Sequence, residues 1–138
     1  METVRFISAA GGHLELSDAV VNRDESLRFR ATLSLAELHA SVGVYDDHPA
    51  GLAVLFDDLA RDWRGFEGIR EWFSLENEFL ITCTSDRLGH VFASIELRNN
   101  WYAGPPPGSP GWNVRANLTI EAGALDGLAR DLHSFLRA

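Results

Sequence analysis

Residues 72–98 read WFSLENEFLITCTSDRLGHVFASIELR, and this stretch decides the predicted fold. Apolar and polar side chains alternate along its two halves, residues 79–84 and 91–98, with the period of two that is typical of strands. Between the halves, Asp86 can start a turn through its side chain, and Gly89 supplies the left-handed residue that closes it. We therefore expect a β-hairpin at the centre of an antiparallel sheet.

The same alternation predicts strands before and after the hairpin. Two short strands over 4–9 and 13–18 would be joined at Gly11-Gly12, and two longer strands would follow over 27–35 and 38–45. A last strand is expected over 112–120. Residues 65–74 are interpreted as an aromatic-rich connection, and residues 104–111 as a loop, because prolines have no N–H to donate to a sheet.

Two segments have helical spacing instead. The first begins after Asp46-Asp47-His48-Pro49, where aspartate can cap a helix and proline suits its first turn, and it ends at Gly65. The second follows Gly123. The apolar faces of the two helices are Leu52, Leu55, Phe56, Leu59 and Trp63, and Leu125, Leu128, Ala129, Leu132, Phe135 and Leu136.

The order of these elements predicts the α+β class. We expect one domain over 1–138, built on a single antiparallel sheet of about seven strands in the order ββββ-α-βββ-α, with both helices packed on one face of the sheet. The other face would then be uncovered. It would carry Arg28, Arg30, His39, Tyr45, Arg98, Asn113, Arg115 and Asn117.

Composition narrows the function classes. The net charge of −8 disfavours a general nucleic-acid binder, although it permits a basic partner or simply reflects solubility. The single cysteine, Cys83, is expected in the core as a small hydrophobic residue. No apolar run is long enough for a membrane helix, so we expect a soluble protein of a reducing cytoplasm, with no membrane partner.

Few residues suggest chemistry. Asp46, Asp47 and His48 lie together as possible metal ligands, but helix capping accounts for the aspartates. His90 and Cys83 lie on opposite arms of the hairpin, so proximity is conceivable. Because no nucleophile elbow, phosphate loop or HExxH helix is present, we expect no enzyme activity, no cofactor and no metal.

Two sets of charged residues are the candidate binding surfaces. The first is acidic and follows the first helix, and it can dock a basic protein: Asp57, Asp58, Asp62, Glu67 and Glu71. The second is the arginine row of the uncovered face, and it can bind RNA or a small anion: Arg28, Arg30, Arg98 and Arg115. Cross-strand pairing with Glu96 and Glu15 is the alternative explanation of these arginines.

A family resemblance rests on particular positions. The set Phe73, Ser74, Leu75, Glu76, Asp86, Leu88, Gly89, His90 and Val91, with the helix over 52–59, resembles the WapI-like immunity proteins of bacteria. The runs Asp62-Trp63-Arg64-Gly65-Phe66-Glu67-Gly68 and 112–121 resemble an uncharacterised bacterial family of unknown function more closely. The resemblance implies a protein that neutralises a cognate toxin, often a nuclease with a basic face, by binding it without catalytic residues.

Overall fold

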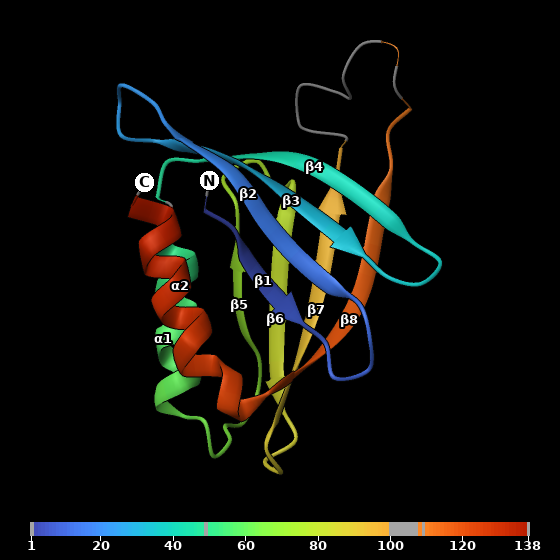
Figure 1. Ribbon diagram of the computed structural model, residues 1–138, viewed down its shortest axis with the longest axis vertical. Coiled ribbons are helices and arrows are strands. Elements are labelled where there is room, and N and C mark those ends of the chain that lie inside the picture. Colours follow the sequence, from blue (N-terminus) through green and yellow to red (C-terminus); the bar gives the residue numbers. More distant parts are fainter. Residues whose placement is uncertain (1, 49, 100–107, 109, 138) are drawn as a thin grey trace.

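The computed structural model describes residues 2–48, 50–99, 108 and 110–137. Four strands come first in the chain, then a helix, four more strands, a short 3-10 helix and a second helix (Figure 1). Their bounds are β1 Val4–Ile7, β2 His13–Val21, β3 Leu27–Ser34, β4 His39–Asp46, α1 Ala50–Arg61, β5 Arg70–Phe73, β6 Phe79–Ser85, β7 His90–Arg98, β8 Asn113–Glu121, η1 Ala122–Ala124 and α2 Leu125–Arg137.

In the described part of the chain, the strands form two four-stranded antiparallel sheets. Sheet A has the order β1-β2-β3-β4 and sheet B the order β5-β6-β7-β8. The predicted single sheet of about seven strands, with both helices on one face, is therefore wrong. The additional strand, β5, lies inside the segment that was expected to be a connection, and it pairs with β6 from Arg70 opposite Cys83 to Phe73 opposite Leu80.

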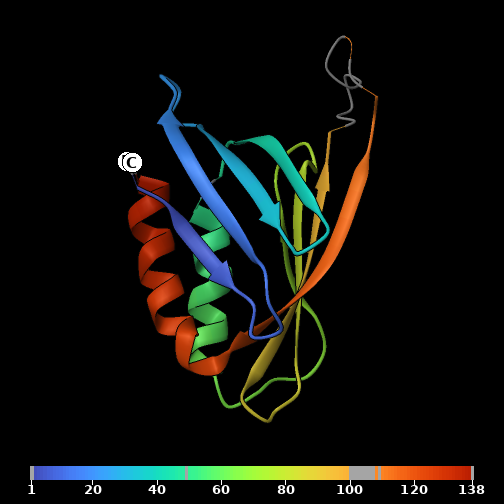
Figure 2. The same cartoon turned by 45° about the vertical axis from the view of Figure 1, so that its right-hand side comes forward.

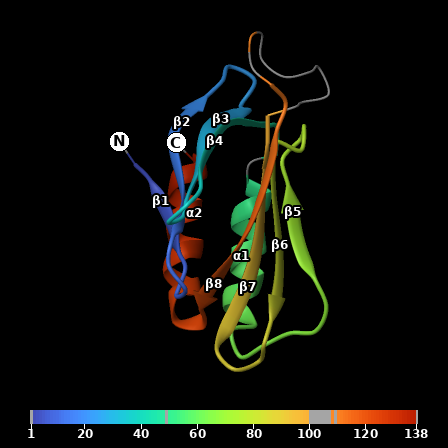
Figure 3. The same ribbon diagram turned by 90° about the vertical axis from the view of Figure 1, so that its right-hand side faces the viewer.

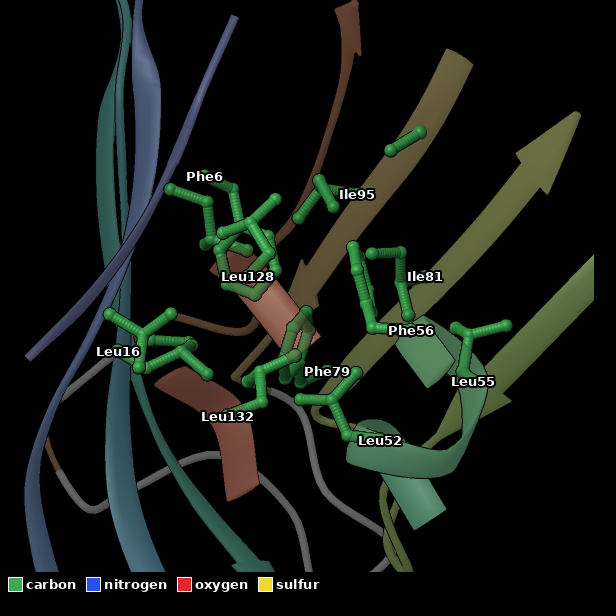
Figure 4. Packing of buried hydrophobic residues seen from close by; sticks show 14 of the residues in the cluster. Phe6, Leu16, Leu52, Leu55, Phe56, Phe79, Ile81, Ile95, Leu128 and Leu132 are labelled. Atoms are coloured by element: carbon green, nitrogen blue, oxygen red, sulfur yellow. The ribbon is translucent and has the colours of Figure 1, made fainter. Parts of the chain in front are cut away.

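Each sheet buries one face, and the two buried faces share a single core with the helices (Figure 4). Phe29 of β3 illustrates the packing, because its ring contacts Phe79 of β6 with ring centres 6.4 Å apart and Phe135 of α2 at 5.9 Å. A large apolar side chain contributes about 1.5–3 kcal/mol when it is fully buried. The burial of apolar side chains between the two sheets therefore favours two packed sheets over one continuous sheet.

The two helices lie side by side between the sheets, along one side of the molecule (Figures 2 and 3). Helix α1 packs beside β5, and α2 packs beside β1. The apolar faces predicted for them are buried, with the exception of Trp63, which is 53% exposed. Edge-to-face packing of Phe6 in β1 on Phe56 in α1, at 5.2 Å, joins sheet A to the helix that lies beside sheet B.

The central hairpin is confirmed. Asp86 Oδ1 accepts hydrogen bonds from the backbone N–H groups of Leu88 and His90 at 2.7 and 3.1 Å, and Gly89 has a φ of 99°. The turn at Gly11-Gly12 is also confirmed, with φ values of 105° and 82°. The helix start expected at Pro49 lies outside the described residues, as does most of the expected loop over 104–111.

Hydrogen bonds join the two sheets at two places. At one, the N–H of Ala9 donates to the carbonyl of Thr119 at 2.8 Å, and the N–H of Thr119 donates to Ser8 Oγ at 3.0 Å. At the other, the buried carboxylate of Asp46 accepts the backbone N–H of Leu75, which lies between β5 and β6. Burial raises the pKa of Asp46, whose Oδ2 atom has no hydrogen-bond partner among the described residues.

Candidate functional site

The five acidic residues predicted to bind a partner lie on α1, on the α1–β5 connection and on β5. Three of them form ion pairs with arginines of the chain, and Asp57 contacts a histidine. Asp57 pairs with His133 at 2.7 Å, Asp58 with Arg61 at 3.1 Å, Asp62 with Arg70 at 2.8 Å, and Glu67 with Arg87 at 2.6 Å, whereas Glu71 is in no ion pair among the described residues. Three of the five carboxylates are therefore offset by neighbouring arginines.

Asp62 has a structural role in this set. Its partner Arg70 also donates to the Asp58 carbonyl at 3.2 Å and lies 4.2 Å from the centre of the Phe66 ring. These contacts tie the end of α1 to the start of β5. The hydrogen bond from Arg70 lowers the pKa of the Asp62 carboxyl below its ordinary value.

The four candidate arginines do not share a face, so the predicted arginine-bearing surface is wrong. Arg28 and Arg30 lie on the outer face of sheet A, whereas Arg98 and Arg115 lie on the outer face of sheet B. On sheet B, Glu96 binds Arg98 at 2.6 Å and Arg115 at 3.4 Å. The expected cross-strand pairing with Glu96 is thus confirmed for Arg115, whereas Arg98 lies on the same strand as Glu96, and Glu15 pairs with Arg5 at 2.7 Å instead.

Cys83 and His90 do not form a catalytic pair. Cys83 is fully buried, as predicted, and burial raises the pKa of its thiol to about 12. His90 points to the opposite face of the sheet, where its Nδ1 atom lies 2.8 Å from Asp86 Oδ2 and its Nε2 atom lies 3.5 Å from Glu121 Oε2. The thiol is therefore protonated at neutral pH and out of reach of the imidazole.

The acidic cluster before α1 does not converge on a metal position. Asp46 points into the core, whereas Asp47 bonds to the exposed His48 at 3.0 Å. The bond to Asp47 raises the pKa of His48 above its ordinary value. Across the described residues, no group of three or more His, Cys, Asp or Glu side chains is arranged to hold a metal ion.

A surface centred on Trp63 was not predicted from the sequence. Its indole is 53% exposed, and the Arg64 guanidinium lies 5.1 Å from the centre of its ring. Leu88, at 82%, is exposed in the adjacent β6–β7 turn. A hollow of about 340 Å³ lies beside the indole, lined by Ala60, Trp63, Gly89, Ala122, Gly123, Leu125 and Asp126. We call these residues, with Arg64 and Leu88, the Trp63 surface.

Local contacts explain why this surface forms. Helix α1 ends at Arg61, one turn earlier than the spacing of its apolar residues predicts, so Trp63 leaves the buried face. Gly65 then has a φ of 135°, and a Cβ atom there would lie 3.0 Å from the Arg87 Cα. Only glycine permits this approach, and the Arg87–Glu67 ion pair holds the two segments together at 2.6 Å. Leu88 and Trp63 are thereby brought to one end of the molecule.

A second, larger hollow lies elsewhere, where β3 and β4 meet the turns before β3 and before β6. It measures about 860 Å³ and is lined by Asn22, Arg23, Asp24, Ser26, Arg28, Phe29, Gly43, Val44, Tyr45, Glu76 and Glu78. Arg28 lies 5.5 Å from the centre of the Tyr45 ring, and Glu78 is buried with a hydrogen bond from Ser74. Because both basic and acidic side chains line this hollow, it favours neither anions nor cations.

Together, these features define an α+β protein with two sheets, two helices and an exposed aromatic surface at one end. In the described residues, no helix is long and apolar enough to cross a membrane. The chain belongs to a family of unknown function, DUF6228, whose model matches residues 5–138. No curated protein matches the chain. No solved structure matches it either.

Proposed function

We propose that the protein is a non-catalytic binding protein of the bacterial cytoplasm, which neutralises a toxin by binding it directly. The observation that carries the proposal is the Trp63 surface. In many protein interfaces a few residues contribute most of the binding energy, and tryptophan and arginine are enriched among them. Such residues usually lie in or beside a well-packed pocket. An indole that is 53% exposed beside a hollow of about 340 Å³ offers such an anchor.

The chemistry of the hollow favours a basic partner. Ala60, Ala122 and Leu125 supply apolar lining, and Asp126 is the acidic residue among those that line it. The aliphatic part of a lysine or arginine side chain fits apolar walls while its charge meets a carboxylate. The net charge of −8 would speed association with a basic protein. The choice of a toxin, and of a nuclease among toxins, rests on the resemblance to WapI-like immunity proteins.

In this proposal the acidic set has a secondary role. Four of its members, Asp57, Asp58, Asp62 and Glu67, already bind basic groups of the same chain. Exposed ion pairs of this kind are worth about 0–1 kcal/mol, and their net field is weak. We therefore place the energetic centre at Trp63 and assign the acidic residues to long-range attraction, with Glu71 the strongest of them.

The test uses the genes beside the one that encodes this protein, because an immunity gene lies next to its toxin gene. Each adjacent product is expressed with and without the protein, and both growth and complex formation are measured. We expect one product to be toxic and the protein to relieve its toxicity. The Trp63→Ala variant should weaken the complex at least about tenfold, because an anchor residue is lost.

Phe73→Ala is the matched control. Phe73 is an aromatic residue of nearly equal exposure, 56%, but it lies on the outer face of sheet B. Its replacement should leave the affinity within about twofold of the wild type. If no adjacent product binds the protein, the proposed function is wrong. If a toxin binds and Trp63→Ala retains full affinity, the Trp63 surface is the wrong surface.

A further inference from the structure

Strand β8 is an edge strand, and among the described residues no hydrogen bond is made to the outer side of its first half. The other edge of sheet B, β5, has four residues and lies beside α1, and β1 of sheet A has four residues and lies beside α2. The remaining edge, β4 of sheet A, has eight residues and pairs with β3 without a bulge. Strand β8 is the longest of the four edges, with nine residues, and its pairing with β7 also runs without a bulge. Long, regular edge strands are usually protected in monomeric proteins, because they present unpaired backbone groups to other strands.

Hydrogen bonds show which backbone groups of β8 face away from β7. The carbonyl of Trp112 accepts the N–H of Asn99 at 3.1 Å, and the N–H of Ala122 donates to the Gly89 carbonyl at 2.8 Å, so even-numbered residues bond toward β7. Thr119, an odd-numbered residue, bonds outward to Ser8 and Ala9. Because the N–H and C=O of one residue point to the same side in an antiparallel strand, this parity holds along β8.

The open stretch is therefore 113–117. Asn113, Arg115 and Asn117 direct their N–H and C=O groups to the free edge, and their side chains are exposed on the outer face of sheet B. Among the described residues, the backbone hydrogen bonds to this edge all go to Thr119. Within the part of the chain that the structure describes, the β1–β2 turn thus bonds to the end of this edge and to none of residues 113–117.

The residues of this stretch are symmetric about Arg115. They read Asn-Val-Arg-Ala-Asn, with an amide at both ends and a small apolar residue on each side of the arginine. We propose that two copies of the chain pair antiparallel through residues 113–117, with the two-fold axis at Arg115. A two-fold interface requires a self-complementary surface, and this stretch provides one.

The proposed register places compatible groups opposite each other. Asn113 faces Asn117 of the second copy, so that their amides can hydrogen-bond, and Val114 faces Ala116 on the inner side, where both are only partly buried. About six backbone hydrogen bonds form between the copies. The two Arg115 side chains meet at the axis, and each has Glu96 of its own copy 3.4 Å away, which offsets their repulsion.

The charge of the whole chain gives the dimer a distinctive salt dependence. Each copy carries a net charge of −8, so the two copies repel each other at low ionic strength. Added salt screens this repulsion. The dimer should therefore become tighter as salt is raised, whereas contacts held by opposite charges would become weaker.

The first test is sedimentation velocity of the full chain at concentrations up to about 200 µM. Arg115→Pro removes an N–H that points to the free edge and leaves the β7–β8 hydrogen bonds in place, so it should weaken the dimer at least about tenfold. Arg115→Ala keeps that N–H and should dimerise at least as well as the wild type. A wild type that stays monomeric throughout, or an Arg115→Pro variant that dimerises equally well, would overturn the proposal.

A second test examines the proposed strand register with charged substitutions and introduces no proline. The double variant Asn113→Asp/Asn117→Asp places carboxylates opposite each other across the axis and should be monomeric, and Asn113→Lys/Asn117→Lys should be monomeric for the same reason. Mixed together, the two variants should form a one-to-one heterodimer, because each aspartate then faces a lysine. If the mixture stays monomeric while the wild type dimerises, the pairing through 113–117 is wrong.

Discussion

The outer faces of the two sheets carry similar residues but hold their arginines in different ways. On sheet A, Arg30 donates to Ser41 Oγ at 2.9 Å, and Arg28 lies over the Tyr45 ring. On sheet B, Glu96 binds both Arg98 and Arg115. Strand register explains part of the difference, because Tyr45 is directly opposite Arg28 and Glu96 is directly opposite Arg115. The other two partners are not directly opposite: Ser41 is diagonal to Arg30, and Glu96 is on the same strand as Arg98. An arginine on an exposed strand is thus held by the nearest suitable group on its own face of the sheet.

Inside the molecule the two sheets are alike. Each contributes a phenylalanine to the same contact, Phe29 from sheet A and Phe79 from sheet B, with the rings at an angle of 80°. The Trp72 ring also packs on Phe79, with ring centres 5.4 Å apart. The two sheets therefore differ in the contacts on their exposed outer faces but share one hydrophobic core, so we expect them to unfold together.

The largest expected effect is at this shared contact. Phe79→Ala should lower the free energy of unfolding by about 3–5 kcal/mol, because it leaves a cavity against Phe29 and Trp72. Urea unfolding followed by circular dichroism and by tryptophan fluorescence should give coincident transitions. Phe73→Ala, at an exposed position, is the control and should stay within about 0.5 kcal/mol of the wild type. Separate transitions for the two probes would show that the sheets do not form one unit.

The alternation of apolar residues was sufficient to predict which side of each strand is buried, but not what covers it. Phe29 and Ala31 alternate with Arg28 and Arg30 in the same way whether a helix or a second sheet lies above them. The number of sheets depends on which strands pair with each other, and the alternation of apolar residues does not determine this pairing. The sequence of strand β5, Arg-Glu-Trp-Phe, does not alternate between apolar and polar residues, and its pairing with β6 defines the strand.

The candidate sites were also predictable only where local sequence patterns determine them. Cys83 and the faces of both helices were predictable, because burial follows from local spacing. Trp63 fits the helical spacing of α1, yet the helix ends at Arg61, and the close approach of Gly65 to Arg87 turns the chain away. The run of glycine, aromatic and charged residues at 62–68 was the only local signal of an unusual turn. The pairing of Glu67 with Arg87 depends on contacts between distant segments.

A smaller effect is expected on the outer face of sheet B. Glu96→Gln should lower the free energy of unfolding by about 1 kcal/mol near neutral pH, because two arginines lose their anion. The hydrogen bond from Arg98 lowers the pKa of Glu96, so the stabilisation is present above the ordinary glutamate pKa and is lost as the pH falls through the lowered value.

The difference between wild type and Glu96→Gln should therefore shrink between about pH 7 and about pH 3. Urea titrations of both proteins across this range measure it. Glu71→Gln is the control, since it makes the same change on the same sheet face at a residue that is in no ion pair among the described residues. A difference that stays constant with pH would mean that the charge of Glu96 does not stabilise the sheet.

The smallest effect is expected on sheet A. Arg30→Ala should change the free energy of unfolding by no more than about 0.5 kcal/mol, because Arg30 is exposed and its partner Ser41 retains a hydrogen bond to Thr32, at 3.0 Å, and access to water. Arg98→Ala, on the outer face of sheet B, leaves Glu96 with one arginine fewer and should cost more. Urea unfolding of the two variants in the same buffer decides the comparison. If Arg30→Ala costs as much as Arg98→Ala, the hydroxyl and the carboxylate hold their arginines equally well, and the two outer faces are energetically equivalent despite their different chemistry.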